Sequence, residues 1–259
     1  MTEPTPTPAS APREPAEPIE SSITPLISGL TLGGRIFARA VSRIRVEGAI
    51  AEIPRDGPVI IASNHASNLD AVVIGSWLMP TLGRRIHWLG KRELFSWPLV
   101  GWAAANGGVH PVDRDAADVE AFRLAKRILD EGHILFVFPE GTRSPDGTLQ
   151  EARDGAALLA LRTGAPIVPI AIGGSNGVWP KGQKLPHPGG HVTVRVGRAF
   201  RLADELPAGT DRRAAKGLAT RLIMERIAAL LPPAQRGFYA TRASAATSPA
   251  ILPTGAPEP

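Results

Sequence analysis

The chain has 259 residues, of which 29 are basic and 24 acidic, with 27 glycines, 26 prolines and no cysteine. The lack of cysteine excludes a disulfide scaffold, an iron–sulfur site, a thiol nucleophile and cysteine-ligated zinc. The length is sufficient for a buried core, and an apolar share of 43% excludes a wholly disordered protein.

The two ends of the chain are unusually rich in proline. Twelve of the 26 prolines lie in the first 20 and the last 28 residues, where no apolar periodicity is present. We therefore predict disordered tails at 1–20 and 232–259. The tails carry net charges of −3 and +1, which leaves +7 on residues 21–231. A basic body favours anionic partners such as nucleic acid, phosphorylated metabolites or anionic lipid.

No membrane-spanning segment is predicted. Residues 1–20 lack the basic start and apolar centre of a secretion signal. The long uncharged stretches 94–112 and 163–180 are interrupted by proline and glycine, whereas a spanning helix needs about 20 mostly apolar residues.

Residues 34–45 fit an amphipathic helix. At about 100° per residue, Arg35, Arg39 and Arg43 share one side, and the apolar residues share the other. Such a helix either packs on the domain core or lies in a membrane interface. The uncharged, leucine-containing run before it favours membrane contact, so 21–45 is predicted to be a membrane-associating segment.

From residue 58 onward, apolar strands and helices alternate. Strands are predicted at 58–62, 85–89, 109–112, 134–138, 166–172 and 191–196; the last alternates in polarity, as an exposed or edge strand does. Helices are predicted at 69–78, 116–131, 151–163 and 210–231. This order indicates a single α/β domain over 46–231, with a largely parallel or mixed central sheet flanked by helices.

A first polar segment, Ser-Asn-His-Ala-Ser-Asn-Leu-Asp, follows the strand 58–62. Five residues separate His65 from Asp70, so on a regular helix they would point about 140° apart. They meet only if His65 lies in the turn before the helix, where the carboxylate would fix the imidazole tautomer and make the other nitrogen a better base. Ser67 and Asp70 also fit a capping box, which needs no catalysis. Both interpretations remain open at this point.

A second polar segment, Phe-Pro-Glu-Gly-Thr-Arg-Ser at 138–144, comes at the end of the strand 134–138. Glycine at 141 lets the backbone approach a ligand closely, and Arg143 suits bidentate contacts with phosphate oxygens. Thr142 adds a hydroxyl, and Glu140 is expected to orient Arg143 or a substrate hydroxyl. For this stretch alone, an ordinary turn with a surface arginine is the alternative.

The two segments together resemble the glycerolipid acyltransferase family, and more narrowly the bacterial 1-acylglycerol-3-phosphate acyltransferases. The resemblance rests on His-x4-Asp after a strand, followed about 75 residues later by the segment 138–144. Three further elements match in the right order: Lys-x-Glu-Leu from Lys91, Gly108 to Arg114, and the apolar 167–170 with its central proline. The match spans roughly 58–173 and leaves the tails uncovered.

The resemblance implies an O-acyltransferase of phospholipid biosynthesis. It would move a fatty acyl group from acyl-CoA or acyl carrier protein, acting as co-substrate, to the free hydroxyl of lysophosphatidate, giving phosphatidic acid. By the same resemblance His65 is the catalytic base and Asp70 orients it, with no cofactor, metal or acyl-enzyme required. The implied substrate-binding residues are Glu140, Gly141, Thr142, Arg143, Arg114 and Lys91.

The resemblance also places the protein at a membrane surface, bound peripherally or monotopically at the cytoplasmic face of the cell membrane. The apolar, aromatic segment 94–102 fits an acyl groove, a membrane-facing patch or core packing. Two departures from the family pattern leave the acceptor open, because His110 replaces a frequent aromatic residue and Ala152-Arg153 replaces a Phe-Lys pair.

Two alternatives remain open. The same chemistry can act on glycerol 3-phosphate or another lysolipid, including a lyso-aminolipid. A different class is a non-catalytic protein that binds anionic lipid or nucleic acid, although the His65/Asp70 pair argues against lost catalysis. Nucleic-acid binding has little support, since no recognition motif is visible and the chain has a single tyrosine. Acyl length, donor carrier and oligomeric state stay open.

Overall fold

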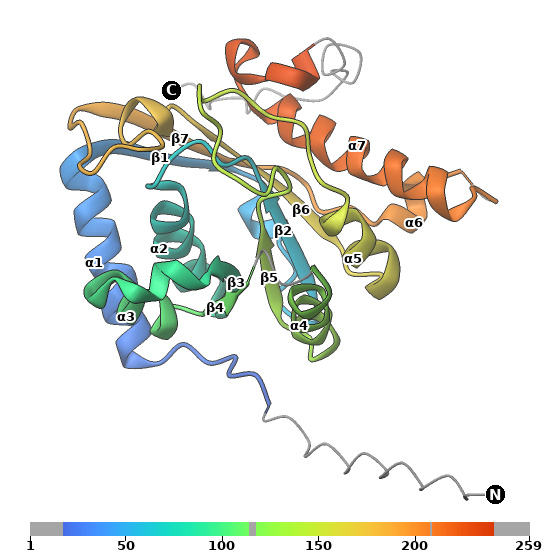
Figure 1. The fold of residues 1–259 in the computed structure, drawn as a ribbon, viewed down its shortest axis with the longest axis horizontal. Coiled ribbons are helices and arrows are strands. Elements are labelled where there is room, and N and C mark those ends of the chain that lie inside the picture. Colours follow the sequence, from blue (N-terminus) through green and yellow to red (C-terminus); the bar gives the residue numbers. More distant parts are fainter. Residues whose placement is uncertain (1–17, 114–117, 208, 241–259) are drawn as a thin grey trace, which may run out of the picture.

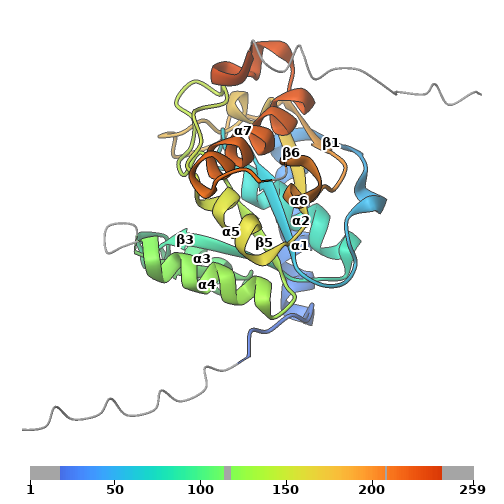
Figure 2. The ribbon, with the colours of Figure 1, turned by 90° about the vertical axis from the view of Figure 1, so that its right-hand side faces the viewer.

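The structure is a computed structural model that describes residues 18–113, 118–207 and 209–240. These residues form a seven-stranded sheet in the order β1-β7-β6-β2-β5-β3-β4, with helices on both faces (Figures 1 and 2). The strands are β1 (Ser42–Gly48), β2 (Val59–Ser63), β3 (Ile86–Lys91), β4 (Val109–Val112), β5 (Ile134–Val137), β6 (Ile167–Gly173) and β7 (Gly190–Val196). Neighbouring strands are parallel except β6 and β7, which pair antiparallel. The predicted α/β fold with a largely parallel, mixed sheet is confirmed.

Helices cover both faces of this sheet. The α-helices are α1 (Pro25–Val41), α2 (Asp70–Leu82), α3 (Pro98–Asn106), α4 (Asp118–Asp130), α5 (Gly155–Thr163), α6 (Leu202–Glu205) and α7 (Arg212–Leu230). Short 3-10 turns occur at η1 (Ile50–Glu52), η2 (Arg92–Ser96), η3 (Ser175–Gly177), η4 (Pro233–Gln235) and η5 (Gly237–Tyr239). Helices α1 and α2 pack on one face, and α4, α5 and α7 pack on the other (Figure 2).

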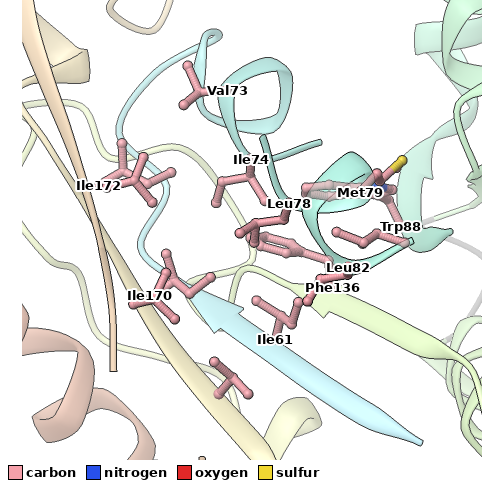
Figure 3. Packing of buried hydrophobic residues seen from close by; sticks show 14 of the residues in the cluster. Ile61, Val73, Ile74, Leu78, Met79, Leu82, Trp88, Phe136, Ile170 and Ile172 are labelled. Carbon is pink, nitrogen blue, oxygen red and sulfur yellow. The ribbon is translucent and has the colours of Figure 1, made fainter. Parts of the chain in front are cut away.

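The central strand β2 shows why the sequence forms this sandwich. All five of its residues are buried, with Val59 and Ile61 in the core under α1 and α2, and Ile60 and Ala62 in the core under the opposite helices. A strand that is covered on both faces reads as a continuous apolar run. Figure 3 shows Ile61 in the first of these cores, among the apolar side chains of α2 and the neighbouring strands.

The amino-terminal boundaries differ from the prediction. Helix α1 ends at Val41 rather than 45, because Ser42 turns extended and its Oγ donates to the carbonyl oxygen of Ala38 at 2.8 Å. Residues 42–45 therefore belong to β1, which pairs in parallel with β7. The alternating sequence of β7 had suggested an exposed or edge strand. The pairing with β1 instead places β7 inside the sheet, between β1 and β6.

The carboxyl-terminal boundary also differs from the prediction. Residues 232–240, assigned to a disordered tail, form the turns η4 and η5, and Tyr239 is buried in the core. The backbone N–H of Leu149 donates to the carbonyl oxygen of Gln235 at 2.9 Å. The domain thus continues to at least residue 240, because this segment closes over the long turn after β5. Of the predicted amino-terminal tail, residues 18–20 are described: Ile19 packs against the core and its N–H donates to Oε2 of Glu131 at 2.7 Å. Residues 1–17 and 241–259 lie outside the described residues.

Within residues 18–113, 118–207 and 209–240, no helix is both long enough and apolar enough to cross a membrane.

Candidate active site

His65 lies in the turn between β2 and α2, at the carboxyl end of a central strand, where the sequence predicted it. Its Nδ1 is 2.9 Å from Oδ2 of Asp70, the first residue of α2. The same oxygen accepts the backbone N–H groups of Ala66 at 2.7 Å and Ser67 at 2.8 Å. The bond from Ser67 is half of the predicted capping box. One fully buried carboxylate oxygen therefore organises the turn and contacts the imidazole at once.

The hydrogen bond to Asp70 defines the chemistry open to His65. When Nδ1–H donates to the carboxylate, Nε2 carries no proton and is available as a base. The ring stacks on Phe138, with 3.8 Å between ring centroids and 10° between planes, and the side chain keeps 20% of its surface exposed. The imidazole is therefore held by Asp70 and Phe138 and still reachable by a ligand.

Asn64 anchors the start of this turn to the neighbouring strand β6. Its side chain donates from Nδ2 to the carbonyl oxygen of Ile172 at 3.0 Å and accepts from the Ile172 N–H at 2.8 Å. The amide is buried, so both bonds are shielded from water. Sequence reasoning assigned no role to Asn64, because its partner lies 108 residues away.

Glu140 ties the second polar segment to the first. Its Oε1 accepts the backbone N–H of His65 at 2.7 Å, and its Oε2 accepts the N–H of Gln150 at 2.8 Å. The N–H of Ser144 donates to the carbonyl oxygen of His65 at 2.7 Å. Segment 138–144 thus holds His65 by both its N–H and its C=O. This arrangement differs from the expectation that Glu140 orients Arg143 or a substrate hydroxyl.

The environment of Glu140 is unusual for a carboxyl group. Burial raises the pKa of Glu140 to about 7, and the two backbone N–H bonds pull the pKa in the opposite direction without overcoming that burial. The neighbouring carboxylate of Asp70 raises the pKa further. Glu140 therefore titrates near neutral pH while holding the backbone of the catalytic candidate.

Four predicted binding residues lie with His65 at the carboxyl ends of the strands. The turn after β5 presents Gly141, Thr142 and Arg143, and Lys91 is exposed at the end of β3, the neighbour of β5. Gly141 has a positive φ of 72°, and a Cβ there would lie 3.0 Å from Nε of Arg153. Glycine is required at this position, both for its backbone conformation and for its contact with Arg153. The predicted binding residue Arg114 lies outside the described residues.

A further loop completes this edge of the sheet. Residues 174–189, which join β6 to β7 (the β6–β7 loop), pack on the His65 turn. The Oγ of Ser67 donates to the carbonyl oxygen of Trp179 at 2.7 Å, and Asn68 N–H donates to the same oxygen at 3.0 Å. Lys181 in this loop contacts Thr142 and Arg143. Sequence reasoning missed Lys181, since nothing local marks a lysine in a proline- and glycine-rich loop.

The departures from the family pattern lie in two different places. His110 lies on the edge strand β4, with its Nε2 3.0 Å from Nδ1 of His87 on β3. Arg153 lies against Gly141 and its N–H donates to the carbonyl oxygen of Pro139 at 2.9 Å. The replacement at 153 therefore belongs to the turn that carries Thr142 and Arg143, and the replacement at 110 packs against a buried histidine.

Curated proteins that are similar to this chain in sequence are named as lipid acyltransferases. A chloroplastic 1-acyl-sn-glycerol-3-phosphate acyltransferase of Arabidopsis thaliana is 34% identical over 144 residues, covering 55% of this chain and 39% of the relative. The corresponding acyltransferase of Pseudomonas aeruginosa is 31% identical over 174 residues, covering 66% of this chain and 65% of the relative. A lyso-ornithine lipid O-acyltransferase of the same organism is 33% identical over 156 residues, covering 59% and 56%. The chain thus matches between about two fifths and two thirds of the length of these relatives.

The fold has a solved counterpart. The crystal structure of PlsC, the 1-acyl-sn-glycerophosphate (LPA) acyltransferase of Thermotoga maritima, superposes with a TM-score of 0.61 at 27% sequence identity, covering 76% of each chain. The Acyltransferase family matches residues 43–173, which make up half of the chain and contain the His65/Asp70 pair and the segment 138–144. On these grounds the protein belongs to the Acyltransferase family.

Proposed function

We propose that this acyltransferase moves a fatty acyl group from acyl-CoA or acyl carrier protein to the free hydroxyl of 1-acylglycerol 3-phosphate, giving phosphatidic acid. The observation that carries the proposal is the contact of 2.9 Å between His65 Nδ1 and the buried Asp70, which leaves Nε2 as a base at the carboxyl edge of the sheet. The activity names of the relatives from Arabidopsis thaliana and Pseudomonas aeruginosa support this acceptor.

The geometry suits direct transfer without an acyl-enzyme. Nε2 of His65 takes the proton of the acceptor hydroxyl as its oxygen bonds to the thioester carbonyl carbon. Asp70 stabilises the resulting imidazolium through the Nδ1 hydrogen bond. When the tetrahedral intermediate collapses, the carbon–sulfur bond breaks, the carbonyl re-forms, and the leaving thiolate takes the proton from Nε2. His65 returns to its starting state, and a thiol leaves beside the new ester.

The phosphate of the acceptor is proposed to bind beside the segment 138–144. Arg143 and Lys91 provide positive charge, and Thr142 provides a hydroxyl donor at the same edge as His65. Guanidinium groups bind phosphate oxygens in pairs, which would orient the glycerol hydroxyl toward Nε2. Gly141 gives this turn its positive φ and leaves room for Arg153, and Glu140 acts through the backbone of His65.

A lyso-aminolipid is the second candidate acceptor. The lyso-ornithine lipid O-acyltransferase is 33% identical to this chain, a value within the range of the lysophosphatidate acyltransferases at 31% and 34%. A lyso-aminolipid acceptor carries no phosphate, so it would make no use of a phosphate site at Arg143.

The decisive experiment is an acceptor and donor panel. The purified full chain is assayed with lysophosphatidate, glycerol 3-phosphate and lyso-ornithine lipid in detergent or liposomes, with acyl-CoA or acyl carrier protein as donor. We expect the highest kcat/KM for lysophosphatidate, and a loss of more than about 1,000-fold in His65→Ala with unchanged circular dichroism. An active His65→Ala variant would refute the mechanism, and a clear preference for lyso-ornithine lipid would replace the proposed acceptor.

We also propose that the protein binds a membrane surface through α1, at the cytoplasmic face of the cell membrane. Helix α1 buries some of its apolar side chains in the core, yet it leaves others in solvent, where Leu32 is 58% exposed and Ile36 is 63% exposed. The arginine side instead faces α2: Arg35 donates from Nε to the carbonyl oxygen of Ser76 at 2.7 Å, and its guanidinium lies 5.6 Å from the ring of Trp77. An exposed apolar face next to cationic groups is typical of interfacial helices.

The segment after β3 extends this apolar surface. Helix α3 contacts α1 and lies beside it in Figure 1, and its first turns expose large apolar side chains: Trp97, Leu99, Val100 and Trp102. Their exposure argues against core packing, one of the three interpretations of 94–102. Gly101 fits tightly against the backbone of Phe95, where a Cβ would meet the carbonyl oxygen at 2.6 Å. A side chain at 101 would therefore push α3 away from the turn that precedes it.

A further inference from the structure

The β6–β7 loop packs against the candidate active site and is held there by specific contacts. Ser67 and Pro180 form an isolated antiparallel bridge, next to the two hydrogen bonds that the carbonyl oxygen of Trp179 accepts from Ser67 and Asn68. On its other side, Trp179 meets Phe37 of α1 edge to face, with 5.8 Å between ring centroids. In Figure 1 this yellow-orange loop lies above α1. The loop therefore has a fixed position between the membrane-facing helix and the His65 turn.

This position brings Lys181 to the segment 138–144. Its Nζ donates to the carbonyl oxygen of Arg143 at 3.1 Å and to Oγ1 of Thr142 at 3.4 Å. An ammonium group has three N–H donors, so these two contacts leave one for a ligand. The side chain is exposed, so the ammonium is accessible to a ligand.

Within the part of the chain that the structure describes, the positive charge of the Lys181 ammonium is not balanced by a nearby carboxylate. Carbonyl and hydroxyl oxygens are neutral, and among the described residues no carboxylate lies within 4.0 Å of the Lys181 ammonium. The contact with the carbonyl oxygen of Arg143 brings the Lys181 ammonium to the turn that also carries the Arg143 side chain, and a positive charge without a paired carboxylate attracts an anion. The site therefore offers a hydroxyl and two cations at one turn, the donor set that a phosphate monoester accepts.

We propose that Lys181 binds the anionic headgroup of the acyl acceptor together with Thr142 and Arg143, and selects acceptors that carry a phosphate monoester over phosphate-free lysolipids. This inference rests on the proposed function at the same site, and adds to it a binding residue from a loop beyond the matched residues 43–173. The loop also joins the headgroup site to α1, which the proposal places at the membrane.

The test removes this charge while keeping the length of the chain. In Lys181→Met, KM for lysophosphatidate is expected to rise roughly tenfold, with kcat within about twofold and KM for the acyl donor unchanged. Lys181→Arg should restore KM to within about threefold, because it returns the charge. Lys184→Met is the matched control, since Lys184 is exposed on the same loop and contacts neither Thr142 nor Arg143 among the described residues. KM for monoacylglycerol, which lacks phosphate, should not change in Lys181→Met.

A binding measurement separates this inference from the proposed function. In a His65→Ala background, which prevents turnover, hexanoyl lysophosphatidate is titrated calorimetrically against proteins with and without Lys181→Met. We expect the substitution to weaken binding at least fivefold, with inorganic phosphate binding far more weakly than the lipid. Equal affinities with and without Lys181 would overturn the inference. Weakened binding combined with a wild-type enzyme that does not acylate lysophosphatidate would overturn the proposed function alone. Equally tight inorganic phosphate would reduce the site to one for free phosphate and overturn the headgroup role.

Discussion

His65 owes its position to residues far from it in sequence. Its ring is held by Asp70 and Phe138, its N–H by Glu140 and its C=O by Ser144. Each restraint fixes a different part of the residue, so the direction of Nε2 depends on all of them together. The catalytic candidate is therefore a property of the two polar segments in contact rather than of either motif alone.

Asp70→Asn tests the electrostatic part of this arrangement. The amide oxygen can still accept the N–H groups of Ala66 and Ser67, but a neutral side chain no longer stabilises an imidazolium at His65. We expect kcat to fall by roughly 1,000-fold, with KM for lysophosphatidate within about threefold and an unchanged circular dichroism spectrum. Steady-state kinetics measure both constants. A variant with kcat within tenfold of the wild type would contradict a role for this carboxylate in proton transfer.

Glu140→Gln tests the backbone clamp. An amide has one acceptor oxygen, so one of the two N–H groups, of His65 or of Gln150, is left without its partner at a cost of about 1–3 kcal/mol. We expect kcat to fall roughly tenfold while KM for lysophosphatidate changes little, since Glu140 faces the backbone. Glu151→Gln, an exposed neighbour, is the control and should leave both constants unchanged.

The raised pKa of Glu140 also predicts a pH dependence of stability. Between pH 4.5 and about 7 the native carboxyl holds a proton that the unfolded chain has already released. The free energy of unfolding is therefore expected to fall as pH rises through this window, by at most about 1.4 kcal/mol per pH unit from this group. Urea unfolding at pH 5 and pH 7.5 should show this contribution in the wild type and its loss in Glu140→Gln. An identical pH dependence in both proteins would contradict the assignment.

His87 predicts the opposite dependence on the acid side. Burial, with the neighbouring His110 and His133 adding to it, lowers the pKa of His87 to about 3. Between pH 6.5 and about 3, His87 is protonated in the unfolded chain and neutral in the native protein. The free energy of unfolding therefore falls as pH decreases toward 3. His87→Leu should be less sensitive to acid than the wild type in urea unfolding at pH 4.5 and 7. The exposed His191→Leu is the control, and equal acid sensitivity of His87→Leu and wild type would refute the prediction.

At the scale of elements, the position of α1 depends on a close contact with α2. A Cβ on Gly34 would lie 2.1 Å from Oγ and 3.4 Å from Cβ of Ser76, whereas a Cβ on Gly33 would meet nothing within 4 Å. The glycine at 34 lets the two helices approach, and Arg35 then reaches the carbonyl oxygen of Ser76. This contact holds Arg35 against α2 and leaves Ile36 exposed.

Adjacent glycines make this contact testable. Gly34→Val forces α1 away from α2, and we expect a loss of about 1–3 kcal/mol in the free energy of unfolding, as overpacking of a contact typically costs. Gly33→Val should be neutral or slightly stabilising, because valine is a better helix former than glycine. Thermal unfolding of the two variants gives the comparison. Equal melting temperatures would show that the α1–α2 contact is not tight.

For the whole molecule, the candidate site and the exposed apolar helices are joined through the β6–β7 loop. That loop touches α1 through Trp179 and the His65 turn through Ser67. In the proposed orientation, α1 and α3 contact the membrane while the candidate site binds a lipid acceptor from the bilayer. Removing 21–45 would test this poorly, since it also removes the buried Ile27, Ala38 and Val41 and half of β1.

Surface substitutions give a cleaner test of membrane binding. Leu32→Glu combined with Ile36→Glu places two charges on the exposed face of α1 without touching buried residues. We expect cosedimentation with liposomes containing phosphatidylglycerol to fall severalfold, while activity on a detergent-dispersed acceptor is retained. Leu218→Glu on α7, an exposed leucine behind the opposite face of the sheet, is the control. Unchanged liposome binding of the double variant would reject α1 as the contact surface.

The alternation of buried strands and helices, the place of His65 in the turn before α2 and the family resemblance could all be inferred from the sequence. These features depend on local periodicity and on motifs a few residues long, which the chain carries without reference to its fold. Asp70 illustrates this, since its contact with His65 spans only five residues.

Which surfaces and side chains meet became visible in the three-dimensional fold alone. The pairing of Ser42 with Gly190 made β1 a strand and moved β7 off the edge of the sheet. The partners of Glu140 and the place of Lys181 at Thr142 depend on loops from different strands converging at one edge. The contact of Glu140 with His65 spans 75 residues and that of Lys181 with Thr142 spans 39, so strand order and loop packing set them and no local pattern of residues encodes them.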